Sequence, residues 1–133
     1  MATFTNLRPM LAVTDLPRTM DFYCRKLGFR CRATFGDPPV WCDLERDGCG
    51  IMFNAPPAES VRRDVPRPSR DYQIFYFNTA DVTALRAEFA ARGVAATDLR
   101  VTVYGTQEFE VRDPDDIWLW FGQPTDEPAT VRE

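Results

Sequence analysis

The sequence contains no histidine. This absence excludes Ser-His-Asp and Cys-His triads, histidine acid–base catalysis and metal sites that depend on histidine ligands. Lysine is nearly absent too, since Lys26 is the only one and almost all positive charge is carried by arginine. Any functional site must therefore be built from carboxylates, arginines, thiols and aromatic side chains.

Long hydrophobic runs and a basic charge balance are also missing. No apolar run approaches the length of a membrane span, and the N-terminal residues MATFTNLRPM lack the pattern of a signal peptide. The net charge is −4 and the isoelectric point is about 4.9, whereas nucleic-acid binding needs a basic face. We therefore expect a cytoplasmic protein with no membrane or nucleic-acid partner, and an acidic balance that mildly favours a cationic ligand.

The cysteines lack the C-x-x-C spacing of many metal and redox sites. Free cysteines in a cytosolic chain behave as small hydrophobic residues and are commonly buried. We therefore expect buried free thiols without a catalytic or metal-binding role. The four cysteines are Cys24, Cys31, Cys42 and Cys49.

The first half of the chain predicts a strand, a helix and three further strands. Asp15 has the position of a helix N-cap, Pro17 falls in the first turn, and Gly28 follows the last periodic apolar residue as a C-cap. Gly and Pro clusters separate the strands that follow. The predicted elements are a strand over 7–13, a helix to about 27, and strands over about 29–35, 40–46 and 49–54.

The second half repeats this order. Asp81 caps a predicted helix that carries apolar residues at helical spacing and ends at Gly93. A strand precedes this helix and three strands follow it, which indicates an internal repeat. The predicted strands are 73–79 and about 99–104, 107–112 and 117–122.

With 133 residues and a hydrophobic fraction of 44%, the chain is long enough for one domain over 1–133. The predicted fold class is α+β, with two βαβββ modules, each a mixed sheet covered on one face by one helix. The other sheet face then needs a partner or a ligand. The predicted boundaries are 4–54 for the first module, 55–70 for a loop rich in Pro and Arg, 71–123 for the second module and 124–133 for a tail.

Two stretches carry the most specific pattern: DLPRTMDFYCRKLGF, residues 15–29, and YGTQEFEVRDPDD, residues 104–116. Together with the element order they resemble the vicinal oxygen chelate superfamily, which includes glyoxalases, extradiol dioxygenases, fosfomycin-resistance enzymes and bleomycin-resistance proteins. The resemblance covers about residues 6–123, and within the superfamily the sequence is most similar to the bleomycin-resistance branch. One departure is Asp116, because the family turn usually reads D-P-x-G; Asp tolerates a left-handed backbone better than most residues.

The resemblance implies a glyoxalase/bleomycin resistance fold, in which paired modules curve round a cleft, and a homodimer. Metal-dependent members place His or Glu ligands at four strand positions. Counted from the helix caps and the DPDD turn, these positions hold Arg8, Ile74, Met52 and Trp120. A guanidinium, an alkyl chain, a lone thioether and an indole do not suit a hard divalent metal. We therefore expect no metal and no cofactor.

Strand alternation predicts which side chains face the cleft. On the last strand, Ile117, Leu119 and Phe121 are predicted to lie under the helix. Trp118 and Trp120 then share the cleft face, where flat indoles offer a stacking surface to planar ligands and a cation–π surface to charged ones. No catalytic residue is predicted. The predicted ligand-binding residues are Trp118, Trp120, Tyr76, Trp41, Met52, Glu108, Glu110, Arg8 and Asn78.

Simpler interpretations of these residues stay open. The two tryptophans can pack between sheets or across a dimer interface. Glu108 and Glu110 can form a solvated face or pair with Arg112 or Arg8, and Arg8 can serve in a structural ion pair. The methionines can be gap fillers, and the aspartates of the DPDD turn can bond to nearby backbone.

The predicted function is metal-independent binding of a bulky cationic or aromatic antibiotic or metabolite, similar to drug sequestration by bleomycin-resistance proteins. The alternative is a metal-free enzyme of the same superfamily, of isomerase or lyase type, in which Glu108 or Glu110 acts as general base. A third possibility is an assembly module whose open sheet face is only its dimer interface. The missing catalytic groups favour binding over catalysis.

Overall fold

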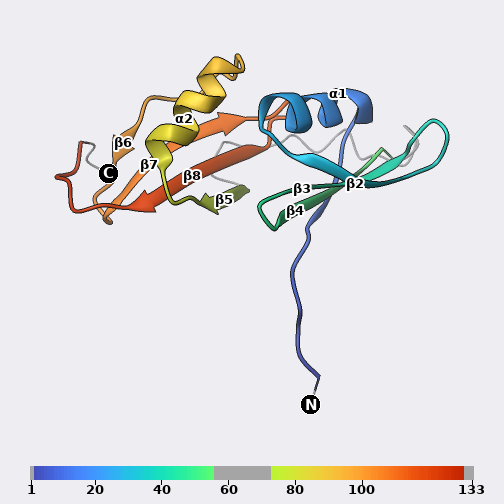
Figure 1. Cartoon of the computed structure of the whole chain (residues 1–133), viewed down its shortest axis with the longest axis horizontal. Helices are drawn as coiled ribbons and strands as arrows, with labels where there is room; N and C mark the ends of the chain where they lie inside the picture. Colours follow the sequence, from blue (N-terminus) through green and yellow to red (C-terminus); the bar gives the residue numbers. More distant parts are fainter. Residues whose placement is uncertain (1, 56–72, 131–133) are drawn as a thin grey trace. The chain divides into compact units, whose positions relative to one another are not determined.

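The structure is a computed structural model that describes residues 2–55 and 73–130. From residue 56 onward the predicted loop 55–70 lies outside the described residues. The chain forms two compact units, Met1–Pro66 and Arg67–Glu133. Each unit contains one four-stranded sheet with a helical segment against one face (Figure 1). The predicted α+β class and the two βαβββ modules are therefore confirmed.

Unit 1 is a mixed sheet with the strand order β1-β4-β3-β2. β1 runs parallel to β4, and the other neighbours are antiparallel. A crossover through the helix makes the parallel pairing possible, as βαβ connections require. The elements are β1 (Met10–Ala12), α1 (Leu16–Asp21), η1 (Phe22–Lys26), β2 (Arg30–Phe35), β3 (Trp41–Arg46) and β4 (Cys49–Asn54).

The first helix begins and ends where the sequence predicts. The Asp15 side chain accepts a hydrogen bond of 3.1 Å from the Arg18 N–H, and Gly28 adopts a φ of 79° after the last turn. The prediction of one regular helix is wrong in detail, because the segment passes from α1 into a π-helical turn, η1. Within this turn the Leu27 N–H donates to the carbonyl of Phe22, five residues earlier, at 3.2 Å.

The core of unit 1 gathers round Tyr23, which η1 presents to the sheet. The Tyr23 ring is fully buried and lies 5.4 Å from the ring of Phe29 and 4.8 Å from that of Phe53, centroid to centroid. Aromatic pairs at such distances stabilise a core beyond the area they bury. Strand alternation adds the remaining buried residues of the sheet, which are Cys42, Leu44 and Ile51.

Unit 2 repeats this architecture with the strand order β5-β8-β7-β6. β5 pairs parallel with β8, and the remaining pairs are antiparallel. Asp81 caps α2 through a 3.0 Å bond from the Ala84 N–H. The elements are β5 (Ile74–Asn78), α2 (Val82–Ala91), β6 (Arg100–Val101), β7 (Thr106–Arg112) and β8 (Trp118–Pro124).

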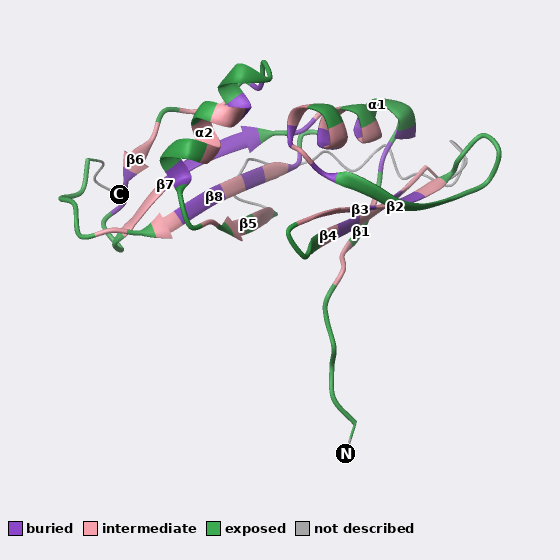
Figure 2. Cartoon of the chain, viewed as in Figure 1, coloured by how far each residue is buried: buried purple, intermediate pink, exposed green. Residues whose placement is uncertain are grey.

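The core of unit 2 lies between α2 and one face of its sheet, where buried and less buried positions alternate along β8 (Figure 2). Phe89 of α2 meets Phe109 and Phe121 edge-on, at 5.9 and 5.2 Å between ring centroids. Phe77 stacks on Phe121 at 4.9 Å. The predicted helix-side residues of the last strand are buried, so the predicted register of β8 is confirmed.

The DPDD turn owes its form to two of its aspartates. Asp113 is buried, and its Oδ1 accepts hydrogen bonds from the N–H groups of Asp115 and Ile117 at 2.8 and 2.9 Å. Asp116 adopts a φ of 64°, which is the left-handed conformation expected at the family's glycine position. The prediction that an aspartate side chain of this turn bonds to nearby backbone is confirmed for Asp113.

Two predicted strands are shortened the most in the structure. β1 covers only 10–12 of 7–13, because Pro9 has no N–H to donate and takes part only as an acceptor from the Met52 N–H, at 2.8 Å. β6 covers only 100–101 of 99–104, because Thr102 already accepts and donates within the turn that leads to Thr106.

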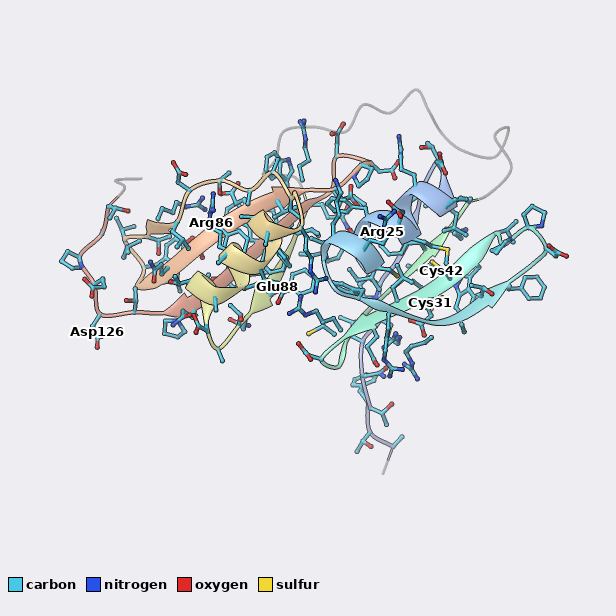
Figure 3. The ribbon with its side chains drawn as sticks, turned by 45° about the horizontal axis from the view of Figure 1, so that its top comes forward. Arg25, Cys31, Cys42, Arg86, Glu88 and Asp126 are labelled. Atoms are coloured by element: carbon cyan, nitrogen blue, oxygen red, sulfur yellow. The ribbon has the colours of Figure 1, made fainter. Side chains whose placement is uncertain are left out.

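The prediction that all four cysteines are buried is wrong. Cys42 is buried and Cys24 is half-buried, but Cys31 and Cys49 are exposed. Cys31 and Cys42 belong to the neighbouring strands β2 and β3 (Figure 3). Burial raises the pKa of the Cys42 thiol to about 12, so this cysteine behaves as a small core residue.

Within the part of the chain that the structure describes, no helix is long and apolar enough to cross a bilayer.

Candidate ligand-binding site

Strand pairing in unit 2 brings six of the predicted site residues onto one face of the sheet, away from α2. Cross-strand partners in a sheet point to the same face. Trp120 of β8 lies between Tyr76 of β5 and Glu110 of β7, and Gly122 lies between Asn78 and Glu108. Trp118, two residues from Trp120, shares their face. We call this surface the aromatic face; its predicted members are Tyr76, Asn78, Glu108, Glu110, Trp118 and Trp120.

Glu108 lies at the bottom of the aromatic face and is fully buried. Its Oε1 accepts hydrogen bonds from Arg100 Nη2 at 3.2 Å and from the Tyr104 hydroxyl at 2.9 Å. Its Oε2 accepts from the Tyr76 hydroxyl at 2.7 Å and from the Thr106 hydroxyl at 2.9 Å. A carboxylate offers about four lone-pair sites, so Glu108 is saturated by protein donors.

Glu110 is also fully buried and forms an ion pair with Arg100. One guanidinium therefore joins both carboxylates, with 16% of the Arg100 side chain left exposed above them. Burial alone would lower the pKa of Arg100, but the hydrogen bond and charge of Glu110 and the charge of Glu108 outweigh it and raise this pKa. Arg100 is thus held as a permanent cation against two buried anions.

The indole of Trp120 completes this cluster. The Arg100 guanidinium carbon lies 5.2 Å from the centroid of the Trp120 ring, which is within cation–π range. The Trp120 Nε1–H is buried, and no acceptor for it lies among the described residues. Arg100 therefore contacts Glu108, Glu110 and Trp120 together.

Tyr76 is the most exposed aromatic residue of this face, at 41%. The pKa of the Tyr76 hydroxyl is raised to about 12. Desolvation is the larger cause, and the hydrogen bond to Glu108 is the second. Its hydroxyl fits because residue 122 is glycine: a Cβ there would overlap the Tyr76 hydroxyl oxygen. Tyr76 thus presents its ring to the surroundings while its hydroxyl reaches the buried carboxylate.

Trp118 lies at the other end of the aromatic face and is half-buried. The Arg112 guanidinium carbon lies 5.9 Å from its ring centroid, and Arg112 also pairs with Asp116 at 3.3 Å. Glu108 and Glu110 both pair with Arg100, an arginine other than the Arg112 and Arg8 that the sequence suggested.

Unit 1 holds the other three predicted site residues on the corresponding face of its own sheet. Trp41 lies opposite Asn54, and Met52 lies between Met10 and Asp43. The Arg8 guanidinium reaches across Gly50, whose missing Cβ leaves the room it occupies. Trp41 and Met52 are half-buried, so part of each side chain is accessible.

Arg8 forms an ion pair with Asp43 and a second, at 3.5 Å, with Glu45. The hydrogen bond to Asp43 is the main reason that the pKa of Arg8 is raised. Arg30 and Arg32 also pair with Glu45, at 3.0 and 3.4 Å. The interpretation of Arg8 as a structural ion-pair residue therefore agrees with its contacts.

The residues at the family's metal positions do not fit a metal ion. Arg8 is a cation already bound to two carboxylates, and Ile74, Met52 and Trp120 offer at most one soft sulfur. Within residues 2–55 and 73–130, no three Cys, Asp or Glu side chains are grouped so that they could hold an ion. We therefore derive no step of function through a metal.

Arg100 and Tyr104 are the site residues that sequence reasoning missed. Both fall in the predicted strand 99–104, and the apolar Val101 marks the helix side of that strand. Alternation would have placed Arg100 on the aromatic face, but Arg112 and Arg8 are the partners that the sequence suggested for the two glutamates. Tyr104 reaches Glu108 through the turn after β6, which no strand pattern predicts.

Most of the sequence matches a known protein family. The family model described as the glyoxalase/bleomycin resistance protein/dioxygenase superfamily matches residues 7–121. Among curated proteins there is no match.

Solved structures share the fold. TnmS3, an antibiotic binding protein from Streptomyces sp. CB03234, is 23% identical with a TM-score of 0.71, over 94% of this chain and 99% of that one. A superfamily member from Nocardioides is 14% identical with a TM-score of 0.72, over 100% and 92%. A lactoylglutathione lyase from Agrobacterium tumefaciens is 16% identical with a TM-score of 0.68, over 92% and 95%. At these identities the likeness shows the fold alone. Since the family model spans most of the sequence, this chain belongs to the glyoxalase/bleomycin resistance protein/dioxygenase superfamily.

Proposed function

We propose that this protein binds a bulky aromatic small molecule, an antibiotic or a metabolite, without transforming it. The observation that carries the proposal is the aromatic face of unit 2, where Tyr76, Trp118 and Trp120 share the side of the sheet that faces away from α2. Rigid indole and phenol rings provide large contact areas at low cost in conformational entropy. Trp118, Trp120 and Tyr76 therefore supply the binding surface.

The proposal favours binding over catalysis because of the state of the carboxylates. A general base must lie within hydrogen-bond reach of the proton it removes. Glu108 and Glu110 are both fully buried, and Arg100 pairs with both. A substrate would have to displace Arg100 before it met either oxygen, which disfavours the metal-free isomerase or lyase with a carboxylate base.

The comparisons supply a second line of support. TnmS3, which shares the fold over nearly its whole length, is described as an antibiotic binding protein. In our proposal this chain has the same kind of role and works as a homodimer that sequesters its ligand. No metal takes part, because the four family positions carry side chains unsuited to it.

The proposal is tested by titrating the purified, chelator-treated protein with bleomycin and a panel of polycyclic aromatic antibiotics. Isothermal titration calorimetry gives the affinity, and tryptophan quenching reports contact with the indoles. We expect saturable binding at micromolar concentration or below for at least one compound, lost in Trp120→Ala.

Asp126→Asn serves as the control, since Asp126 is an exposed residue of the C-terminal segment (Figure 3) and should bind as the unaltered protein does. Circular dichroism must show that Trp120→Ala remains folded. Absence of binding across the panel, or equal binding by Trp120→Ala, would contradict the proposal.

A further inference from the structure

The charged cluster on the aromatic face has a layered arrangement. Glu108 and Glu110 form the lower layer against the sheet and are fully buried. Arg100 forms the upper layer, because its guanidinium bonds to both carboxylates and lies over the ring of Trp120. The charge nearest to a ligand that lies against Trp120 is therefore positive, although the cluster as a whole carries two carboxylates and one guanidinium.

The distances decide what such a ligand experiences. A group in contact with Arg100 lies closer to one positive charge than to the two negative charges behind it, and Coulomb energies fall as the inverse of distance. The two opposing contributions are then of similar size. Without Arg100, the two carboxylates would act on the ligand unopposed and would strongly favour a cation.

We propose that Arg100 is the specificity-determining residue of the aromatic face: it cancels the field of Glu108 and Glu110, so that the face selects planar, uncharged ring systems over cationic ones. This inference rests on the proposed function and names its ligand class. The acidic composition suggests a cationic ligand instead. The carboxylates that would bind such a ligand, Glu108 and Glu110, are already paired with Arg100.

Hydrogen bonding agrees with this assignment. Glu108 is saturated by four protein donors and has no acceptor site left for a ligand cation. The guanidinium of Arg100 is planar and stacks on aromatic rings, so its outer surface suits a flat aromatic compound. A cationic ligand would meet like charge there and could reach the carboxylates only by displacing Arg100, which pairs with both of them through charge-assisted contacts.

The test uses two compounds with one tricyclic ring system: acridone, which is uncharged, and 9-aminoacridine, which is a cation at neutral pH. Calorimetry or equilibrium dialysis gives the ratio of their dissociation constants. The unaltered protein should bind acridone at least as tightly as 9-aminoacridine. In Arg100→Met the ratio should shift toward 9-aminoacridine by about tenfold or more, equivalent to about 1.4 kcal/mol.

Arg100→Met leaves two carboxylates buried without their shared cation and can fail to fold. Glu110→Gln is therefore the second variant, because it removes one negative charge, keeps Arg100, and should shift the ratio in the opposite direction, by several-fold. Arg92→Met is the matched control and should leave the ratio unchanged. Arg92 pairs with Glu88, and Glu88 belongs to α2, on the helix side of unit 2 (Figure 3).

The outcomes separate the two proposals. Opposite shifts in Arg100→Met and Glu110→Gln support the role of Arg100, as does the Glu110→Gln shift alone if the other variant does not fold. Binding of both compounds with an unchanged ratio in the folded variants overturns the inference but leaves the aromatic-ligand function standing. If the unaltered protein binds 9-aminoacridine more tightly than acridone, the inference is likewise overturned and the aromatic-ligand function likewise stands. Binding of neither compound counts against both.

Discussion

The two units place charged clusters at related positions of their sheets, but they complete them differently. In unit 1, Arg8, two residues before β1, extends across Gly50 of β4 to Glu45 of β3. In unit 2, Tyr76 of β5 extends across Gly122 of β8 to Glu108 of β7. In both units the glycine lies directly opposite the glutamate in the strand register.

In both units a long side chain crosses a glycine to reach a glutamate, although the side chain that crosses is an arginine in one unit and a tyrosine in the other. In the order of the sheet, the long side chain comes from the outer parallel strand or the residues just before it. The glycine belongs to the neighbouring strand and leaves room for that side chain, and the carboxylate belongs to the strand beyond it. The two units differ in how deeply the glutamate is buried. Glu45 keeps 16% of its side chain exposed and pairs with three arginines, whereas Glu108 is fully buried with one arginine and three hydroxyl donors.

The largest expected difference between the units is the cost of removing an arginine. Arg100→Met should lower the free energy of unfolding by about 3–5 kcal/mol, because it leaves buried carboxylates without their cation. Arg8→Met should cost about half as much or less, since Arg30 and Arg32 still pair with Glu45 and water reaches that cluster. Urea unfolding followed by circular dichroism measures both. Equal losses would show that burial does not distinguish the clusters.

The glycines give the next largest contrast. Gly122→Ala should cost about 1–3 kcal/mol, because its Cβ overlaps the hydroxyl of Tyr76, whose rigid ring must move as a whole. Gly50→Ala should cost less, since the overlapping atoms belong to the flexible end of Arg8. Thermal unfolding of the two variants at one protein concentration tests this order. A smaller loss for Gly122→Ala than for Gly50→Ala would contradict it.

Alkaline titration sharpens the comparison further. The pKa of Tyr76 in unit 2 and that of Cys42 in unit 1 are both raised to about 12, so the folded protein holds these protons more tightly than the unfolded chain does. The stability that each group contributes is present below its ordinary pKa and is lost as pH rises toward 12.

Tyr76→Phe should lower the free energy of unfolding by about 1–2 kcal/mol at neutral pH, through the lost bond to Glu108. It should also remove one tyrosine that titrates near pH 12 from the tyrosinate absorbance curve. The unaltered protein, titrated under the same conditions, is the reference. If Tyr76→Phe instead removed absorbance that develops near about pH 10, Tyr76 would not carry the raised pKa.

The smallest expected effect concerns the thiols, which all belong to unit 1. A thiol reagent at neutral pH should modify Cys31 and Cys49 quickly, Cys24 more slowly, and Cys42 only on unfolding. Peptide mapping after timed labelling measures the order. If Cys42 were modified as fast as Cys31, unit 1 would unfold locally far more readily than its packed core implies. The labelling reports on unit 1 alone, because unit 2 contains no cysteine.

The sequence by itself determined the element order, the two helix caps, the DPDD turn and the face assignments. These features depend on local chemistry: Asp15 and Asp81 cap through a bond three residues away, Asp113 bonds within its own turn, and strand alternation follows from a period of two. The absence of histidine is likewise a property of the sequence alone, and it restricts the chemistry open to this chain whatever its fold.

Only the tertiary structure decided what the glutamates do. Glu108 and Glu110 look alike in the sequence as cleft carboxylates, but β6 lies beside β7 and brings Arg100 over both of them. That pairing depends on strand order and register, which local patterns do not specify. The same is true of the glycines, because Gly50 and Gly122 gain their role from the side chains that cross them from a strand distant in sequence.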